Sequence, residues 1–330
     1  MTDEALPFRT GDSGAAVRDL QERLAACGHP ACTTDIDGGD PSATFGPTTD
    51  AAVRAFQTER RIVVDGVVGR QTWSALVEAS YRLGDRLLYR AKPMLRGDDV
   101  AELQRRLGGL GFDAGRVDGI FGPDTTAAAE DFQRNVGIVA DAIVGPDTIA
   151  AIARLGERSS TNDPIGPLHE TERLRAAPKG LSGFRVVVSD RGGAAALADA
   201  VGRRLTTGGA EVVVVHDPDD SRVARQANTF DAGAVVGLSI GSRVATAYYG
   251  RTGSESVGGR RLATAIDAEL SMVLGCIPTP PTPMTLPLLR ETRAPAVIAD
   301  VGPPSAVVVS VPRLAESCAT AVTSWVADPA

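Results

Sequence analysis

An internal repeat is the feature that most constrains this chain. Shifting the 330-residue sequence by 76 positions aligns "FGPTTDAAVRAFQTERRIVVDGVVGRQTW", from Phe45, with "FGPDTTAAAEDFQRNVGIVADAIVGPDTI", from Phe121. Upstream, "GAAVRDLQERL" from Gly14 matches "GDDVAELQRRL" from Gly97 at an offset of 83. The larger upstream offset indicates an insertion in the first copy, within "HPACTTDIDGGDPSA". Self-similarity of this kind predicts two modules with the same fold.

Each copy has the pattern of a small helical module. Apolar residues recur at helical spacing in both copies, and Pro47 and Pro123 each follow a Phe-Gly pair, where a helix can begin. We therefore predict three short helices in each copy. The expected all-α modules cover residues 1–80 and 81–155.

The two copies resemble the peptidoglycan-binding repeat of cell-wall hydrolases. Copy one keeps "VDGVVGRQTW", whereas copy two keeps "VDGIFG" and has Ala142 and Ile149 where copy one has Gly66 and Trp73. The resemblance implies binding of wall sugars, and a helical scaffold used for protein contacts is the alternative. The residues that carry the signature are Gln21, Phe45, Gly46, Phe56, Asp65, Gly66, Trp73, Gln104, Asp118, Gly119, Phe121, Gly122 and Phe132.

Charge and apolar content exclude several classes of function. The formal net charge is −7 and no basic stripe is present, which argues against a nucleic-acid surface. The start "MTDEALPFRTGDSG" has no basic or apolar segment typical of a secretory signal, and no apolar run approaches the roughly 20 residues that span a bilayer. We therefore expect a cytoplasmic protein without a transmembrane segment.

The cysteines predict free thiols. Four cysteines are present without a C-x-x-C spacing, and a reducing cytosol disfavours disulfides. A bridge between Cys27 and Cys32 is the alternative.

The second half of the chain predicts an α/β domain. Residues 156–180 mix Ser, Pro, Gly and charge without apolar periodicity, which is typical of a linker. From 181 to 330, apolar runs alternate with helical patterns, and a final helix is expected from Pro312 to Val326. This alternation predicts a mostly parallel sheet covered on both faces. The whole chain is thus expected to be multidomain, with two all-α modules before the α/β domain.

The α/β domain resembles the zinc-dependent N-acetylmuramoyl-L-alanine amidases. The segments "FRVVVSDRGG", "ARQANTFDAGAVVGLSIGSRV", "GGRRLATAIDAEL" and "LPLLRETRAPAVIADVG" follow one another in the order of that family. Two amino-terminal repeats before such a domain resemble the actinobacterial CwlM-type proteins. That resemblance implies a cytoplasmic amidase homologue that regulates peptidoglycan precursor synthesis.

The positions that the resemblance assigns to zinc carry other residues in this chain. Arg191 stands where the family has its first histidine ligand, and Gly241 stands where an S-I-H motif has the second. No acidic residue follows Gly193 before Asp199, so the segment with the ligand glutamate is missing. Asp300 replaces the catalytic glutamate. Arginine cannot ligate a metal, so we expect no zinc cofactor and no intact catalytic residue.

Anion binding is one chemistry that these replacements could support. Arg191 and Arg243 are expected at the carboxyl ends of strands, and Gly192 and Gly193 precede a helix whose free amides attract negative charge. A phosphosugar or nucleotide precursor would suit such a site. Surface ion pairs of the two arginines are the alternative.

Two further arrangements involve His216, which ends the second expected strand. His216 with Asp190 and Asp300 could form an unrelated metal site, and Ser189, His216 and Asp300 could form a hydrolase triad. The triad lacks the G-x-S-x-G elbow. A hydrogen-bonded structural histidine is the alternative to both.

Three functions follow from the sequence. The first is a non-catalytic pseudo-amidase that regulates precursor synthesis, for which the CwlM-type resemblance implies the UDP-N-acetylglucosamine enolpyruvyl transferase MurA as partner and control by a Ser/Thr kinase. The second is an active zinc amidase. The third is a binding module for muropeptides, wall fragments or precursors. The expected contact surfaces are the repeats and the proline-rich loop Pro278–Pro283.

Overall fold

The computed structural model describes residues 6–30, 43–156, 166–176 and 179–328. The contacts divide the chain into two units, Met1–Gly166 and Pro167–Ala330. Each unit has its own hydrophobic core, and each is described by itself. The predicted insertion and Cys32 lie largely or wholly outside the described residues.

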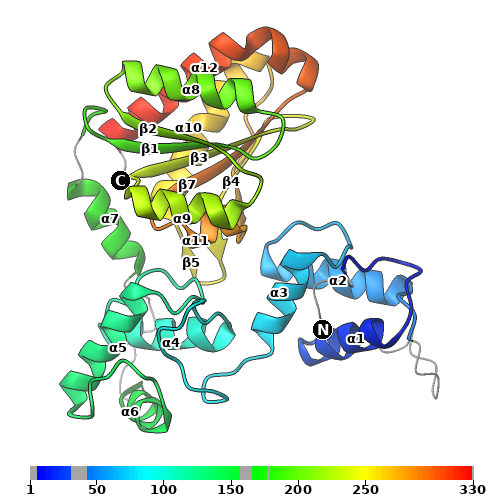
Figure 1. Cartoon of the computed structure of the whole chain (residues 1–330), viewed down its shortest axis with the longest axis vertical. Coiled ribbons are helices and arrows are strands. Elements are labelled where there is room, and N and C mark those ends of the chain that lie inside the picture. Colours follow the sequence, from blue (N-terminus) through cyan, green and yellow to red (C-terminus); the bar gives the residue numbers. More distant parts are fainter. Residues whose placement is uncertain (1–5, 31–42, 157–165, 177–178, 329–330) are drawn as a thin grey trace. The chain divides into compact units, whose positions relative to one another are not determined.

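The first unit contains two three-helix modules, as predicted (Figure 1). Repeat 1 consists of α1 (Ala15–Ala26), α2 (Pro47–Arg60) and α3 (Arg70–Ala79). Repeat 2 consists of α4 (Asp98–Gly109), α5 (Pro123–Val136) and α6 (Pro146–Gly156). Pro47 and Pro123 open their helices at the first turn, where no amide hydrogen bond is lost.

Short antiparallel bridges join the loops of each repeat. Phe8 pairs with Val68 in repeat 1, and Leu88 pairs with Val144 in repeat 2. The helices of each repeat enclose a separate apolar core around a pair of buried phenylalanines. These are Phe45 and Phe56 in repeat 1 and Phe121 and Phe132 in repeat 2.

The second unit is an α/β fold with a mostly parallel sheet, which confirms the predicted class. Its strands are β1 (Arg185–Asp190), β2 (Glu211–His216), β3 (Ala234–Ile240), β4 (Ala245–Arg251), β5 (Ser254–Glu255), β6 (Thr282–Met284) and β7 (Ala296–Val301). The order is β2-β1-β3-β7-β4-β5, with β6 paired to β4. The strands β2, β1, β3 and β7 are parallel, and β4 runs antiparallel to β7.

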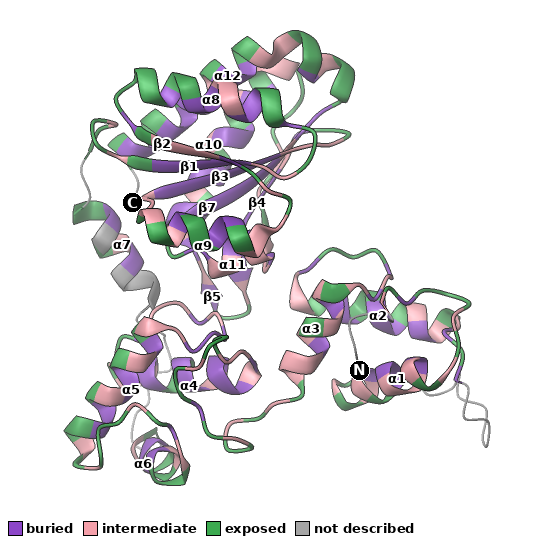
Figure 2. Cartoon of the chain, in the orientation of Figure 1, coloured by how far each residue is buried: buried purple, intermediate pink, exposed green. Residues whose placement is uncertain are grey.

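Helices cover both faces of the sheet (Figure 1). One face packs against α8 (Ala195–Thr207), α10 (Val257–Leu274) and α12 (Pro304–Ala327). The other face packs against α9 (Asp220–Phe230) and α11 (Pro287–Glu291). The central strands are buried on both sides (Figure 2). This arrangement explains their continuous apolar runs.

The helix α12 begins earlier than predicted. It starts at Pro304 and continues through Pro312, where we expected it to begin. Pro312 lies on the exposed side of the helix, so the hydrogen bond that it cannot donate is lost next to solvent. Among the described residues, α12 is also the one helix with the length and apolar composition of a membrane span.

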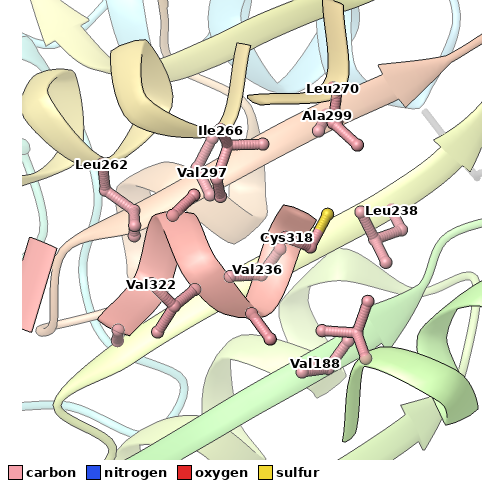
Figure 3. Packing of buried hydrophobic residues seen from close by; sticks show 14 of the residues in the cluster. Val188, Val236, Leu238, Leu262, Ile266, Leu270, Val297, Ala299, Cys318 and Val322 are labelled. Atoms are coloured by element: carbon pink, nitrogen blue, oxygen red, sulfur yellow. The ribbon is translucent and has the colours of Figure 1, made fainter. Parts of the chain in front are cut away.

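The inner face of α12 packs into the core of the second unit. Cys318 and Val322 lie against Val236 and Leu238 of the sheet (Figure 3). Burial raises the pKa of the Cys318 thiol to about 12. In this fold α12 is therefore a core helix, with Cys318 as a buried free thiol.

A helix that the sequence did not predict lies inside the expected linker. The helix α7 (Gly166–Ala176) places the buried Glu170 against the start of α10. One Glu170 oxygen accepts a hydrogen bond from Ser256 Oγ at 2.5 Å, and the other accepts one from Val257 N at 3.1 Å. The pattern missed this helix because its buried residues, Glu170 and Leu174, do not form an apolar stripe. The predicted proline-rich loop likewise contains β6 at its end.

Candidate functional site

The carboxyl ends of three neighbouring strands bring together the positions that the amidase resemblance assigns to zinc and catalysis. Arg191 follows β1, Gly241 follows β3, and Asp300 lies near the end of β7. Ser239 is opposite Asp300 across β3 and β7. Parallel strands end at the same edge of a sheet, with neighbours about 5 Å apart. The three predicted positions therefore lie at one edge of the second unit.

An internal ion pair engages the side chain of Arg191. Its Nε and Nη2 donate to the two carboxylate oxygens of Asp220, both at 2.8 Å. Both side chains are mostly buried, and Asp220 opens α9. Paired donation to a carboxylate has the planar geometry that suits a guanidinium. Arg191 therefore forms an ion pair, as in the alternative, but the pair is mostly buried and does not lie on the surface.

The helix start has its own carboxylate cap. Asp219 precedes α9 and accepts hydrogen bonds from Ser221 N and Arg222 N at 3.0 and 3.2 Å. Desolvation opposes ionisation of Asp219, but these two amides and the Arg222 guanidinium lower its pKa below the usual value. The cap fixes the first turn of α9 and so holds Asp220 beside Arg191.

A carboxylate also occupies the glycine turn. Asp190 Oδ1 accepts hydrogen bonds from Gly192 N and Ala194 N, each at 2.9 Å. Two amides that were expected to attract an external anion are thus bound to the chain itself. Arg243, in the loop after β3, is exposed and forms no ion pair within the described part of the chain. Anion binding stays a prediction, and Arg243 is an exposed member of the predicted set whose side chain has no ion-pair partner among the described residues.

The donor set at this edge does not fit a zinc ion. Ser239 Oγ donates a hydrogen bond to Asp300 Oδ1, and Gly241 presents no side chain. A Cβ added at Gly241 would lie 3.0 Å from Asp300 Cβ, so the position that the resemblance assigns to the second histidine adjoins Asp300. An arginine, a glycine and one aspartate cannot supply the N and O ligands of a zinc centre. Within the described residues, no group of three or more His, Cys, Asp or Glu side chains could hold a metal.

The structure does not bring His216 to Asp300. Their strands lie three positions apart in the sheet, which separates them by roughly 14 Å. His216 Nε2 is instead 3.0 Å from Asp199 Oδ1, and its Nδ1 is 3.9 Å from Asp190 Oδ2. The alternative metal site and the hydrolase triad are therefore both wrong, and His216 links α8 to the edge of the sheet.

Ser189 is buried on the face covered by α9 and α11. Its Oγ has no hydrogen-bond partner among the described residues. A Cβ added at Gly237, on the adjacent strand, would lie 3.4 Å from this oxygen and 2.8 Å from Arg191 Cδ. The Arg191 side chain therefore passes close to Ser189, and no base lies within hydrogen-bond distance of the Ser189 hydroxyl among the described residues.

In the repeats, the polar signature forms buried hydrogen-bond nodes. Gln57 Nε2 donates to Asp65, Val67 and Thr72, and its Oε1 accepts from Asp65 N and Gly66 N. The same role recurs at three other glutamines, with their aspartate or threonine partners. They are Gln21 with Thr49, Gln104 with Asp118 and Thr125, and Gln133 with Asp141 and Thr148.

These nodes stabilise the turns between the helices. All four glutamines are almost completely buried. A buried amide that makes several hydrogen bonds fixes local structure, because each unmade bond would be costly. The signature residues therefore account for the fold of the repeats and do not by themselves indicate a sugar site.

Comparisons with known proteins agree with both halves of this description. The family model of a peptidoglycan binding domain matches residues 13–76 and 96–152. The N-acetylmuramoyl-L-alanine amidase CwlM of Mycobacterium tuberculosis (strain ATCC 25618 / H37Rv) is 36% identical over 333 residues, covering 89% of this chain and 81% of that protein. The chain belongs to the CwlM-type amidase family.

Two other similarities cover less. The amidase CwlL of Bacillus licheniformis is 32% identical over 168 residues, which is 45% of each chain. The crystal structure of an N-acetylmuramoyl-L-alanine amidase from Clostridium difficile 630 covers 45% of this chain and 100% of that one, at 17% identity and a TM-score of 0.39.

Within this CwlM-type chain, the two repeats differ at the positions that departed from the signature. Trp73 in repeat 1 is partly exposed, with the Arg23 guanidinium 5.3 Å from its ring centroid. Ile149 in repeat 2 is likewise partly exposed, and both side chains pack against the core of their own repeat. Ala142 adopts a φ of 58°, close to the 73° of its counterpart Gly66. The backbone of the turn is thus kept although the glycine is lost.

Sequence reasoning missed two carboxylates that make buried contacts in this CwlM-type chain. Asp220 neutralises Arg191, and Glu170 caps α10. The acidic run "DPDD" directly after β2 could have indicated a partner for Arg191, since the carboxyl ends of neighbouring strands converge. Nothing in the sequence around Glu170 indicates its burial.

Proposed function

We propose that this CwlM-type chain is a non-catalytic, cytoplasmic regulator of peptidoglycan precursor synthesis that acts by binding protein partners. The observation that carries the proposal is the Arg191–Asp220 ion pair at the position of the first zinc ligand. The Arg191 guanidinium cannot ligate a metal and is held in place by Asp220, and Gly241 offers no replacement ligand. The edge of the sheet then has no means of activating water for amide hydrolysis.

The partner that the family resemblance suggests is the enolpyruvyl transferase MurA. The proposal is tested with the purified full chain and MurA from the same organism. We expect saturable binding in calorimetry and a changed rate of enolpyruvyl transfer. Absence of both effects with MurA and with the other precursor enzymes would overturn the regulatory function.

The catalytic alternative is tested separately. The full chain is purified with excess zinc, its metal content is measured, and release of stem peptide from muropeptides is followed beside an active amidase of the family. We expect no stoichiometric zinc and no release. One zinc ion per chain together with turnover would instead establish an active amidase.

A second function is favoured by one observation, the match of both repeats to the peptidoglycan binding domain. Trp73, within the matched residues of repeat 1, is a partly exposed aromatic residue on which a sugar ring could stack. If the repeats bind wall fragments, Trp73→Ala should weaken muropeptide binding by the full chain, whereas Ile149→Ala in repeat 2 should not. Equal binding by all three proteins would remove Trp73 from this function.

A further inference from the structure

Repeat 2 presents apolar side chains on the outer face of its loop bridge. Leu88 and Val144 pair through backbone hydrogen bonds of 3.2 and 2.8 Å, and both side chains are completely buried. Side chains alternate between the two faces of an extended segment. Leu87 and Tyr89, on either side of Leu88, therefore point outward and are 53% and 45% exposed.

The opposite segment completes this face. In an antiparallel pair centred on Leu88 and Val144, Tyr89 lies across from Ile143, and Leu87 lies across from Gly145. Ile143 is 43% exposed. A Cβ added at Gly145 would lie 3.2 Å from Leu87 Cδ2, so Leu87 lies over the bare backbone of the glycine. The result is an exposed apolar surface built on two paired segments.

Positive charge follows this surface directly along the chain. The stretch "RLLYRAKPMLRG" from Arg86 to Gly97 holds four basic residues and no acidic one, although the chain as a whole has a net charge of −7. Arg90 and Lys92 are exposed and have no ion-pair or hydrogen-bond partner among the described residues. Met94, two residues further on, is 40% exposed.

The sister repeat lacks this combination. Its bridge pairs Phe8 with Val68, and the flanking outward residues are Pro7, Arg9 and Val67. No exposed aromatic residue lies there. The two repeats share a fold, so the fold does not require the apolar and basic character of repeat 2 at this point. Figure 2 shows the segment between α3 and α4 as mainly exposed and intermediate.

We propose that this surface, the basic-apolar strip of Leu87, Tyr89, Arg90, Lys92, Met94 and Ile143, binds an extended acidic segment of a partner protein. An extended peptide presents alternate side chains on one face, which matches the spacing of Leu87 and Tyr89. Carboxylates on that segment complement Arg90 and Lys92. An anionic bilayer fits less well because basic clusters that bind anionic lipid hold about four to eight Lys or Arg residues, and the strip offers only Arg90 and Lys92 as unpaired cations among the described residues. Neutral sugars offer no charge to the two cations.

This inference rests on the proposed function only in taking a protein as the partner. It is tested with the full chain and fluorescent peptides of about ten residues that alternate Glu with Leu or Phe. A second peptide has Lys in place of each Glu, and a third has Ser in place of each apolar residue. We expect saturable, salt-sensitive binding of the first peptide alone.

Two variants and two matched controls locate the binding. One double variant, Arg90→Glu/Lys92→Glu, reverses the charge of the strip, and the other, Leu87→Ser/Tyr89→Ser, removes its apolar and aromatic anchors. Each should weaken peptide binding by about tenfold or more. Val63→Ser/Val64→Ser alters residues of similar exposure in repeat 1, and Arg203→Glu reverses an exposed charge on α8. These controls should change the affinity by less than about twofold.

Several results would overturn the proposal. One is absence of binding to the first peptide, and another is an equal loss of peptide affinity in variants and controls. A third is binding of phosphatidylserine vesicles or muropeptides, in place of the peptide, that depends on the strip residues. The proposed function fails on different evidence, namely zinc-dependent hydrolysis or absence of any effect on precursor enzymes. If the strip variants still bind MurA as the unaltered chain does, the regulatory function stands and the strip proposal is wrong.

Discussion

The two repeats of the first unit share their buried polar contacts and differ in what surrounds them. In both, a buried glutamine binds the turn before the third helix, through Gln57 in repeat 1 and Gln133 in repeat 2. Outside these nodes, repeat 1 keeps the partly exposed Trp73, whereas repeat 2 has an apolar and basic surface. The shared residues stabilise the fold of the module, and the residues that differ are the candidates for function.

The ion pair of Arg86 and Asp99 provides the sharpest contrast between the repeats. Asp99 is 1% exposed and accepts from Arg86 Nε at 2.7 Å, and the Arg86 guanidinium lies over the Tyr81 ring. Removing one partner of a buried pair leaves the other charge unpaired. We expect Asp99→Ala to lower the free energy of unfolding of repeat 2 by about 3 kcal/mol.

Hydrogen exchange of α4 and α5 in the full chain measures this effect. The adjacent Asp98 pairs with Arg60 and is partly exposed, so Asp98→Ala is the control and should cost at most about 1 kcal/mol. Repeat 1 has Ala16 at the position of Asp99 and should keep its exchange rates. Equal effects of the two variants would show that burial does not set the strength of this pair.

The glutamine nodes should be equivalent in the two repeats. Each of two substitutions, Gln57→Ala and Gln133→Ala, leaves buried donors and acceptors of the turn without hydrogen-bond partners. We expect each to destabilise its own repeat by about 2–3 kcal/mol. Exchange at the third helices, α3 and α6, measures the loss in each case. A large effect in one repeat with none in the other would contradict the shared role of the nodes.

The sequence predicted the architecture better than the site. The repeat offset predicted both helical modules, and the alternation of strands and helices predicted the parallel sheet, because periodicity reflects burial directly. The same reasoning identified the edge that carries Arg191, Gly241 and Asp300. It could not predict the Arg191–Asp220 pair or the Glu170 cap, since both depend on contacts between segments that are distant in sequence.

The glycine of the turn distinguishes the repeats on a smaller scale. Gly66 has a φ of 73°, and a Cβ there would lie 2.4 Å from Asp50 Oδ1 and 2.5 Å from Arg54 Nη2. Those atoms end flexible, partly exposed side chains that can move aside. Gly66→Ala should therefore cost about 1–2 kcal/mol, mainly from the left-handed backbone. Exchange in α3 measures the cost, and an unchanged rate would mean that the backbone strain is negligible.

Each repeat also has one residue in the left-handed conformation where its sister has glycine. Ala142, with a φ of 58°, corresponds to Gly66, and Arg61, with a φ of 54°, corresponds to Gly137. Substitution by glycine relieves the backbone strain and adds some entropy to the unfolded chain. We expect Ala142→Gly and Arg61→Gly each to stabilise the local repeat by about 0.5–1 kcal/mol.

The gain should slow exchange about two- to fivefold in the repeat that carries the change and leave the other repeat unaltered. Arg61 ends α2 and Ala142 lies in the turn before α6, so the two gains should appear in different repeats of the doubly substituted chain. Additive gains would confirm that the repeats are stabilised independently. A gain that spreads to the sister repeat would instead mean that the two modules unfold together.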